Sequence, residues 1–174
     1  MSLPPVADSP VEDTPGAPST SPPAEDLDAF CSLSAALSGF DDVELRATGV
    51  GETYLAWLLR VFGDVMAELL GVWRTIEADD PPDRREAALR EKVLADPTLG
   101  PLARAVLVLW YTATWRPLSA DWSAAHGKHP GGDEGFVFGT AYPEGLMWRA
   151  AVGAHPAAAK PTGFGSWALA PEDT

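Results

Sequence analysis

Three histidines are the side chains of this sequence best suited to binding a metal ion. His126 and His129 lie three residues apart in the segment HGKHP, and His155 lies further along the chain. A zinc site needs three or four ligands held on a fixed framework. The first two histidines are instead surrounded by Gly, Lys and Pro, a composition typical of a loop. We therefore favour a solvated loop here and keep a small His-based metal protein as an alternative hypothesis.

Signatures of nucleotide binding and nucleophilic catalysis are not found in the sequence. It has no Gly-x-Gly-x-x-Gly fingerprint, no phosphate loop ending in Gly-Lys-Ser/Thr and no Gly-x-Ser-x-Gly elbow. The stretch GGDEG, residues 131–135, does not have the ligand spacing of a calcium loop. The single cysteine, Cys31, excludes an intrachain disulfide and is expected to pack as a small apolar residue. These observations favour a noncatalytic protein without a cofactor or metal of its own.

Aromatic side chains are the strongest remaining signal, because the chain has seven tryptophans in 174 residues. Trp57, Trp73 and Trp110 lie in apolar, helix-patterned segments, where packing in the core is expected. Trp148 and the two rings of GFGSWALAP, residues 163–171, lie in a Gly- and Pro-rich region. Such rings either pack on their own domain or anchor a partner, and the residues alone leave both alternatives open.

Helices are predicted to position most of these rings. Apolar residues recur three or four positions apart from Leu27 to Leu37, with Gly39 as a candidate C-terminal cap. A longer apolar face runs from Tyr54 to Ile76, with Thr48 as a candidate cap before it. The sequence thus predicts a short helix followed by a long one.

Two further helices are expected before the composition changes. Asp80 and Pro81 have the arrangement of an N-cap and a first-turn proline, and helix formers continue to Asp96. A last regular helix is expected to end before Pro117, on the spacing of Leu102, Val106, Leu109 and Ala113.

The fold class predicted from these patterns is all-α, an irregular bundle of four to five helices. Residues 1–24 are a Pro/Ser/acidic tract that is expected to be disordered. Residues 25–174 are expected to form a single helical domain, including an irregular C-terminal segment, 117–174, that wraps the domain and is rich in aromatic residues. Within that segment only YPEGLMWRAAVG, residues 142–153, is patterned as a short helix.

Net charge narrows the classes of partner. The formal charge is −13, and nine acidic residues but no basic one precede Arg46. This balance is unsuited to nucleic acid and to anionic membrane surfaces. No run of about 20 apolar residues predicts a membrane span, and no basic, apolar secretory signal is found. The sequence as written predicts a cytoplasmic protein, with the periplasm as the alternative if a partner exports it.

Several short motifs occur in an order that resembles a known family. The sequence reads LDAFCSLSAALSGF, GETYLAWLL, VLVLWYTATW, YPEGLMWRAAV and then KPTGFGSWALAP, from Leu27 to Pro171. This succession resembles the small (gamma) subunits of membrane-associated, FAD-dependent sugar dehydrogenases, which include those of sorbitol, fructose and glucose. The resemblance implies a helical accessory protein that binds, stabilises and chaperones a large flavoprotein subunit of the glucose–methanol–choline type. FAD is then expected in that partner, and a cytochrome c subunit often completes the complex.

The resemblance also implies which residues contact the partner. Leu33, Leu37 and Gly39 match the opening motif. Two features depart from the family: no arginine precedes Arg46 where relatives carry a twin-arginine signal, and His155 stands where some relatives have a cysteine. A stand-alone helical interaction module therefore remains the alternative. The residues expected at the partner interface are Trp110, Tyr111, Tyr142, Trp148, Phe164, Trp167 and Pro171.

Overall fold

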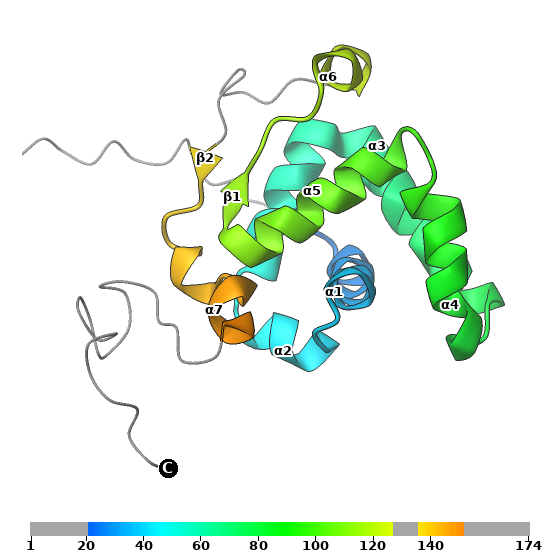
Figure 1. Ribbon diagram of the computed structural model, residues 1–174, viewed down its shortest axis with the longest axis horizontal. Helices are drawn as coiled ribbons and strands as arrows, with labels where there is room; N and C mark the ends of the chain where they lie inside the picture. Colours follow the sequence, from blue (N-terminus) through cyan, green and yellow to red (C-terminus); the bar gives the residue numbers. More distant parts are fainter. Residues whose placement is uncertain (1–20, 127–135, 152–174) are drawn as a thin grey trace, which may run out of the picture.

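A long helix, α3 (Gly51–Asp79), is the element against which α1 (Ala24–Ser38), α4 (Pro82–Leu89) and α5 (Leu99–Thr112) pack (Figure 1). The computed structural model describes residues 21–126 and 136–151. Four residues on the inner face of α3 are fully buried, as the apolar periodicity predicts: Tyr54, Leu58, Leu69 and Ile76. The helix is kinked at Phe62, where φ is −123° and ψ is 27°, next to the flexible residue Gly63.

Helices α1 (Ala24–Ser38) and α2 (Asp42–Ala47) precede α3. Gly39 ends α1 in the left-handed region at φ 80°, so its predicted capping role is confirmed. Asp41 caps α2, because its side chain accepts from the Glu44 N–H while the Glu44 carboxylate accepts from the Asp41 N–H. The prediction that Thr48 caps α3 is wrong: Val50 occupies the cap position, and the Thr48 hydroxyl donates to the Leu45 carbonyl at the end of α2.

The chain then turns back through α4 (Pro82–Leu89), a π-helical turn η1 (Arg90–Leu94) and α5 (Leu99–Thr112). The predicted N-cap was one residue early, because Pro81 is the cap of α4 and Asp80 ends α3. Arg85 from α4 donates to the Glu77 and Asp80 carbonyls at the end of α3, at 2.7 and 3.2 Å. These hydrogen bonds satisfy carbonyls that a helix end otherwise leaves unpaired.

A sharp bend separates α4 and η1 from α5. The helix axis changes direction by 113° between Pro82–Leu94 and Leu99–Thr112. A Cβ placed on Gly100 would lie 2.6 Å from the Leu94 carbonyl oxygen, so the bend depends on a residue without a side chain. Arg104 closes it by donating to the same carbonyl at 2.7 Å. Among the helices of residues 21–126 and 136–151, none by itself is long and apolar enough to cross a membrane, and this bent pair reaches that length and composition only together.

The chain after α5 is irregular but holds several short elements. Ala113 ends α5 in the left-handed region at φ 51°. Strands β1 (Thr114–Trp115) and β2 (Phe136–Val137) then pair antiparallel, with Thr114 opposite Val137. Helix α6 (Ala120–His126) leads away from β1, and a 3₁₀ turn, η2 (Tyr142–Glu144), leads into α7 (Leu146–Ala150). The predicted helix within residues 142–153 is therefore confirmed for α7, whereas α6 was not predicted.

The core is an unusually aromatic one. Trp57, Trp73 and Trp110 are 7%, 3% and 1% exposed, which confirms the predicted core packing, and Cys31 is buried at 1%. The Trp110 ring lies 5.8 Å from that of Phe30 and 5.3 Å from that of Tyr54, between centroids. Further rings continue from Tyr54 toward α6, with centroids 4.9 to 6.0 Å apart: Phe138, Trp57, Phe62, Trp115 and Trp122.

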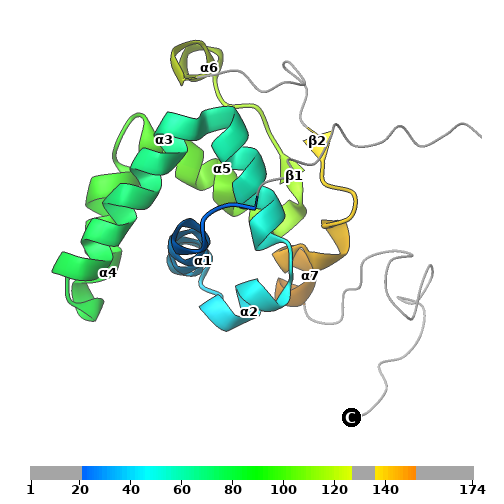
Figure 2. The same cartoon turned by 180° about the vertical axis from the view of Figure 1, so that it is seen from behind.

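The all-α prediction is confirmed. The four to five predicted helices correspond to α1, α3, α4, α5 and α7, and the described ranges add the short helices α2 and α6. Figure 2 shows α3 in front of α5 from the opposite side, so the two helices cross as layers with α1 beside them. The first helix begins at Ala24, close to the predicted start of the folded part, and residues 1–20 lie outside the described ranges.

Candidate partner-binding surface

Four half-buried rings, which we call the aromatic end, gather where α1, α5 and α7 meet: Phe40, Tyr111, Tyr142 and Trp148. Tyr111 lies in the last turn of α5, and its hydroxyl donates to the Ser38 carbonyl at the end of α1 at 3.2 Å. The Phe40 ring meets Tyr111 edge-on, with centroids 6.1 Å apart. Residues more than 70 positions apart in the chain are thus held in one place.

Helix α7 completes the aromatic end. The Trp148 indole N–H donates to the Tyr142 carbonyl at 3.0 Å, and the two rings lie 5.4 Å apart in an edge-to-face arrangement. A Cβ on Gly145 would lie 2.8 Å from the Tyr111 carbonyl oxygen. The backbone before α7 therefore approaches the end of α5 as closely as glycine permits, which fixes α7 beside Tyr111. Figures 1 and 2 both place α7 next to α2 at this end of the molecule.

The structure separates the residues predicted for the partner interface. Tyr111, Tyr142 and Trp148 come together and are partly exposed. Trp110 is 1% exposed and its indole N–H donates to Ser34 at 2.8 Å, so it belongs to the core of this chain and leaves no surface for a partner. The predicted contacts Phe164, Trp167 and Pro171 lie outside the described residues.

Phe40 is a member of the aromatic end that the sequence did not single out. It lies one residue past the Gly39 cap, a position that the helical periodicity of α1 does not reach. Its backbone N–H donates to the Ser38 hydroxyl at 3.3 Å. The hydrophobic residue that often follows a glycine cap was the available signal.

Two buried titratable groups lie close to this end without an exposed reactive atom. Tyr54 is fully buried. This burial, and to a smaller extent the Glu144 carboxylate, raises the pKa of its hydroxyl well above the ordinary value. Burial also raises the pKa of the Cys31 thiol, and a raised pKa lowers the thiolate fraction on which reactivity depends. Neither group is poised as a nucleophile or base at neutral pH.

Of the three histidines in the alternative hypothesis of a metal protein, only His126 lies among the described residues. His126 lies at the end of α6, with its ring 4.9 Å from that of Trp122. His129 and His155 lie outside the described residues. Within residues 21–126 and 136–151, no three His, Cys, Asp or Glu side chains are placed to hold one metal ion.

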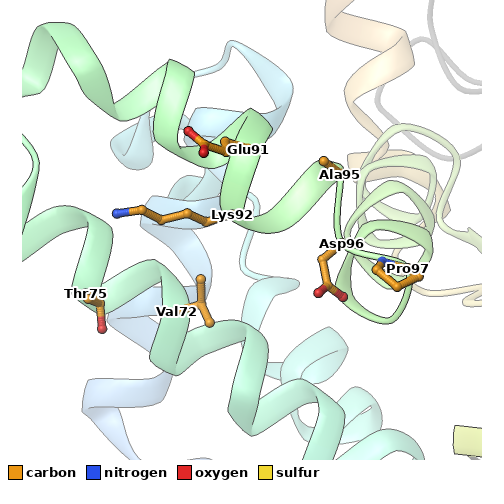
Figure 3. Close-up of a pocket in the computed structure, with 7 residues that line it drawn as sticks. All are labelled: Val72, Thr75, Glu91, Lys92, Ala95, Asp96 and Pro97. Atoms are coloured by element: carbon orange, nitrogen blue, oxygen red, sulfur yellow. The ribbon is translucent and has the colours of Figure 1, made fainter.

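A groove on the described surface lies elsewhere, between α3, η1 and the turn before α5 (Figure 3). Its volume is about 680 Å³. Two of its three charged side chains are engaged structurally: Lys92 donates to Asp80 at 2.8 Å, and one Asp96 oxygen accepts from the Thr98 and Leu99 N–H groups. Figure 3 shows Lys92 and Asp96 at opposite ends of the groove. This arrangement brings no acid and base together over one reacting atom.

No protein-family model, curated protein or solved structure matches this chain. Three of the five motif stretches lie next to one another at the aromatic end, through Phe40, Tyr111 and Trp148.

Proposed function

We propose that this chain is a noncatalytic small subunit that binds and stabilises the FAD-containing catalytic subunit of a sugar or alcohol dehydrogenase. The observation that carries the proposal is that three motif stretches, which contain Phe40, Tyr111 and Trp148, lie next to one another on one surface. In this proposal FAD and the reacting groups belong to the partner, a flavoprotein of the glucose–methanol–choline type, and a cytochrome c subunit is a third component.

The aromatic end has the physical properties of an anchor. Tyr and Trp bury a large area and have few side-chain torsions to restrict, and for this reason they are enriched in interfaces. Tyr111 and Trp148 are each already held by one hydrogen bond to a carbonyl of this chain. Because their orientation is fixed before binding, less conformational entropy is lost when a partner covers them.

Co-expression tests the proposal directly. The chain would be produced together with a flavoprotein encoded by a neighbouring gene, and co-purification, soluble yield and bound FAD would be measured; the lack of any such gene would itself contradict the proposal. We expect a complex with flavin in the large subunit and a lower soluble yield of flavoprotein when this chain is omitted. Separate purification, with an unchanged yield of soluble flavoprotein, would contradict the proposal.

Two ring truncations locate the contact. Trp148→Ala is expected to weaken the complex by about 2 kcal/mol, whereas Trp148→Phe, which keeps a ring, is the matched control. Trp167→Ala, in the terminal motif, is expected to cost about 2–4 kcal/mol of binding and less than that in stability of the isolated chain. If the isolated chain unfolds instead, Trp167 belongs to its own core.

A further inference from the structure

Helix α6 is joined to the other helices of the described chain through one side chain. Of its seven residues Trp122 alone is buried, at 7% exposure, and four of the others are exposed. The Trp122 ring meets that of Phe62 in α3 edge-on, with centroids 5.6 Å apart, and its indole N–H donates to the Thr98 carbonyl at 2.9 Å. Figures 1 and 2 both show α6 at the edge of the molecule. Trp122 is therefore the anchor of α6.

The other side-chain hydrogen bonds of α6 are local. The Ser119 hydroxyl accepts from the Trp122 backbone N–H at 3.3 Å, and the Ser123 hydroxyl donates to the Leu118 carbonyl at 3.4 Å. Within residues 21–126 and 136–151, Trp122 is the only α6 side chain that hydrogen-bonds beyond this segment. Isolated helices shorter than about 12–15 residues are marginal in water. We therefore expect α6 to unwind when the Trp122 ring leaves its site.

Helix α7 is equally short but is attached in a different way. Its first residue, Leu146, is fully buried, and a Cβ on Gly145 would lie 2.8 Å from the Tyr111 carbonyl oxygen. The backbone at the start of α7 is thus fixed against the end of α5, with which α7 packs. What distinguishes α6 is its attachment through one ring, and not its length.

The site that the Trp122 ring covers is aromatic. Phe62 lies at the kink of α3, is 4% exposed and has its ring 5.2 Å from that of Trp115 in β1. The Trp115 ring is fully buried and lies 4.9 Å from that of Trp57. Because Phe62 contacts Trp122 directly, it is the first of these core rings that water reaches when α6 moves away.

An unpaired hydrogen-bond donor in this site favours the opening of α6. The Trp115 indole N–H is buried and has no partner among the described residues. A buried donor without a partner costs free energy, and that cost is recovered when water reaches the donor. Residues 116–119, which connect Trp115 to α6, are exposed or half-buried. Movement of α6 and this connection therefore gives water a route to Trp115.

We propose that α6 is a lid that opens and unwinds as a unit when the Trp122 ring leaves its site, while α1, α3 and α5 remain folded. The open state exposes an aromatic surface of α3 and β1, formed by Phe62 and Trp115, with one free hydrogen-bond donor. Local openings of this kind have free energies below that of global unfolding. The lid does not depend on the function proposed above.

Native-state hydrogen exchange of the full chain, followed by NMR at increasing urea concentrations, tests the lid. The α6 amides and the Trp115 indole N–H are expected to be protected at least about tenfold less than the buried amides of α3 and α5. Their exchange should depend little on urea, because a local opening exposes little surface. Exchange of these groups only through global unfolding would overturn the inference. An α6 without any protection in the wild-type chain would also overturn it, because the lid would then have no closed state.

A pair of surface substitutions tests whether α6 opens independently. Ala124→Gly, at an exposed position of α6, lowers helix propensity and is expected to speed exchange of the α6 amides about fivefold. The free energy of global unfolding, measured by urea titration, should not change. Ala67→Gly makes the same change at an exposed position of α3, and we expect it to lower global stability without changing α6 exchange. A loss of global stability in Ala124→Gly would place α6 in the same cooperative unit and overturn the lid.

Removal of the anchor tests the role of Trp122. Trp122→Ala is expected to abolish the protection of the α6 amides and of the Trp115 indole N–H, while the buried amides of α3 and α5 stay protected. Trp148→Phe, in α7, is the control and should leave α6 exchange unchanged. Unchanged α6 protection in Trp122→Ala would overturn the assignment of the anchor. Where Trp122→Ala also destabilises the whole domain, Ala124→Gly decides, because it removes no core contact.

Discussion

Helices α4 and α5 are neighbours in the chain, yet the side chains that they expose to solvent differ in charge. In α4 the exposed side chains include Asp83, Arg84 and Glu86, and only its last two residues, Ala88 and Leu89, are buried. In α5 one residue of 14 is charged, and seven of the 14 are not fully buried. The exposed side of α4 is therefore charged, whereas that of α5 is mostly uncharged.

The two helices are stabilised by different means. Helix α4 depends on a first-turn proline, on the Glu86–Arg90 pair and on Arg85, which connects it to the end of α3. Helix α5 depends on buried apolar area along its inner face, and burial of this kind outweighs surface charge pairs in stability. Substitutions in the two helices and at their junction test whether apolar burial contributes more to stability than surface charge pairs do.

Trp110→Ala removes a buried ring from the side of α5 that packs in the core. It removes a ring that is 1% exposed and leaves the buried Ser34 hydroxyl without its donor. The expected loss in free energy of unfolding is about 3–5 kcal/mol, measured by denaturant titration. Trp148→Ala, at the half-buried aromatic end, is the comparison and should cost about 1 kcal/mol in the isolated chain. Equal losses at the two positions would contradict the assignment of Trp110 to the core.

Gly100→Ala tests the junction between the two helices. The added methyl would meet the Leu94 carbonyl oxygen at 2.6 Å, so backbone must shift, and we expect a loss of about 1–3 kcal/mol. Gly71→Ala is the control, because nothing lies within 4 Å of a Cβ at this helical position. That substitution should raise the free energy of unfolding by about 0.5–1 kcal/mol. A stabilising effect at Gly100 would show that the bend does not need a glycine.

Tyr54→Phe tests a polar group beneath α5. The Tyr54 hydroxyl is buried and has no hydrogen-bond partner among the described residues, so its removal at neutral pH should be neutral or slightly stabilising. Burial raises its pKa in the folded state, so above about pH 10 the phenol ionises first in the unfolded chain, and stability falls as pH rises further. The alkaline loss should be smaller in the variant. Urea titrations at several alkaline pH values measure the difference.

Glu86→Gln, on the exposed surface of α4, is expected to change the free energy of unfolding least. The Glu86 carboxylate lies 2.9 Å from Arg90, and both side chains are more than 70% exposed. Pairs of this kind contribute about 0.3–0.5 kcal/mol and are screened by salt. The expected loss is therefore below about 0.5 kcal/mol and should vanish at high salt. A larger loss would mean that α4 depends on this pair more than its exposure indicates.

The long apolar periodicities were sufficient to predict the fold class and the main helices. Tyr54 to Ile76 and Leu102 to Ala113 repeat often enough that only a helix buries them. Helix α6 was missed because its seven residues hold one large apolar side chain, Trp122, whose indole N–H donates to Thr98 far away in the sequence. A local sequence pattern does not reveal a contact between residues that lie far apart in the chain.

The candidate surface was only partly predictable. Sequence order indicated Tyr111, Tyr142 and Trp148, but the neighbour of a conspicuous motif residue can face the other way, as Trp110 does beside Tyr111. The exposure of Val108 on α5 was not predicted, because apolar periodicity identifies only the side of a helix that enters the core. Knowing that Val108 is exposed requires the positions of the surrounding helices.

The π-helical turn Arg90–Leu94 has a consequence for how this protein tolerates changes in length. The Ala95 N–H donates to the Arg90 carbonyl, so this turn holds one residue more than an ordinary α-turn. A homologue one residue shorter between Leu89 and Pro97 can close the turn to α-helical geometry and retain both flanking helices. Alignments of such homologues should place a single-residue gap here, and α5 would keep its orientation.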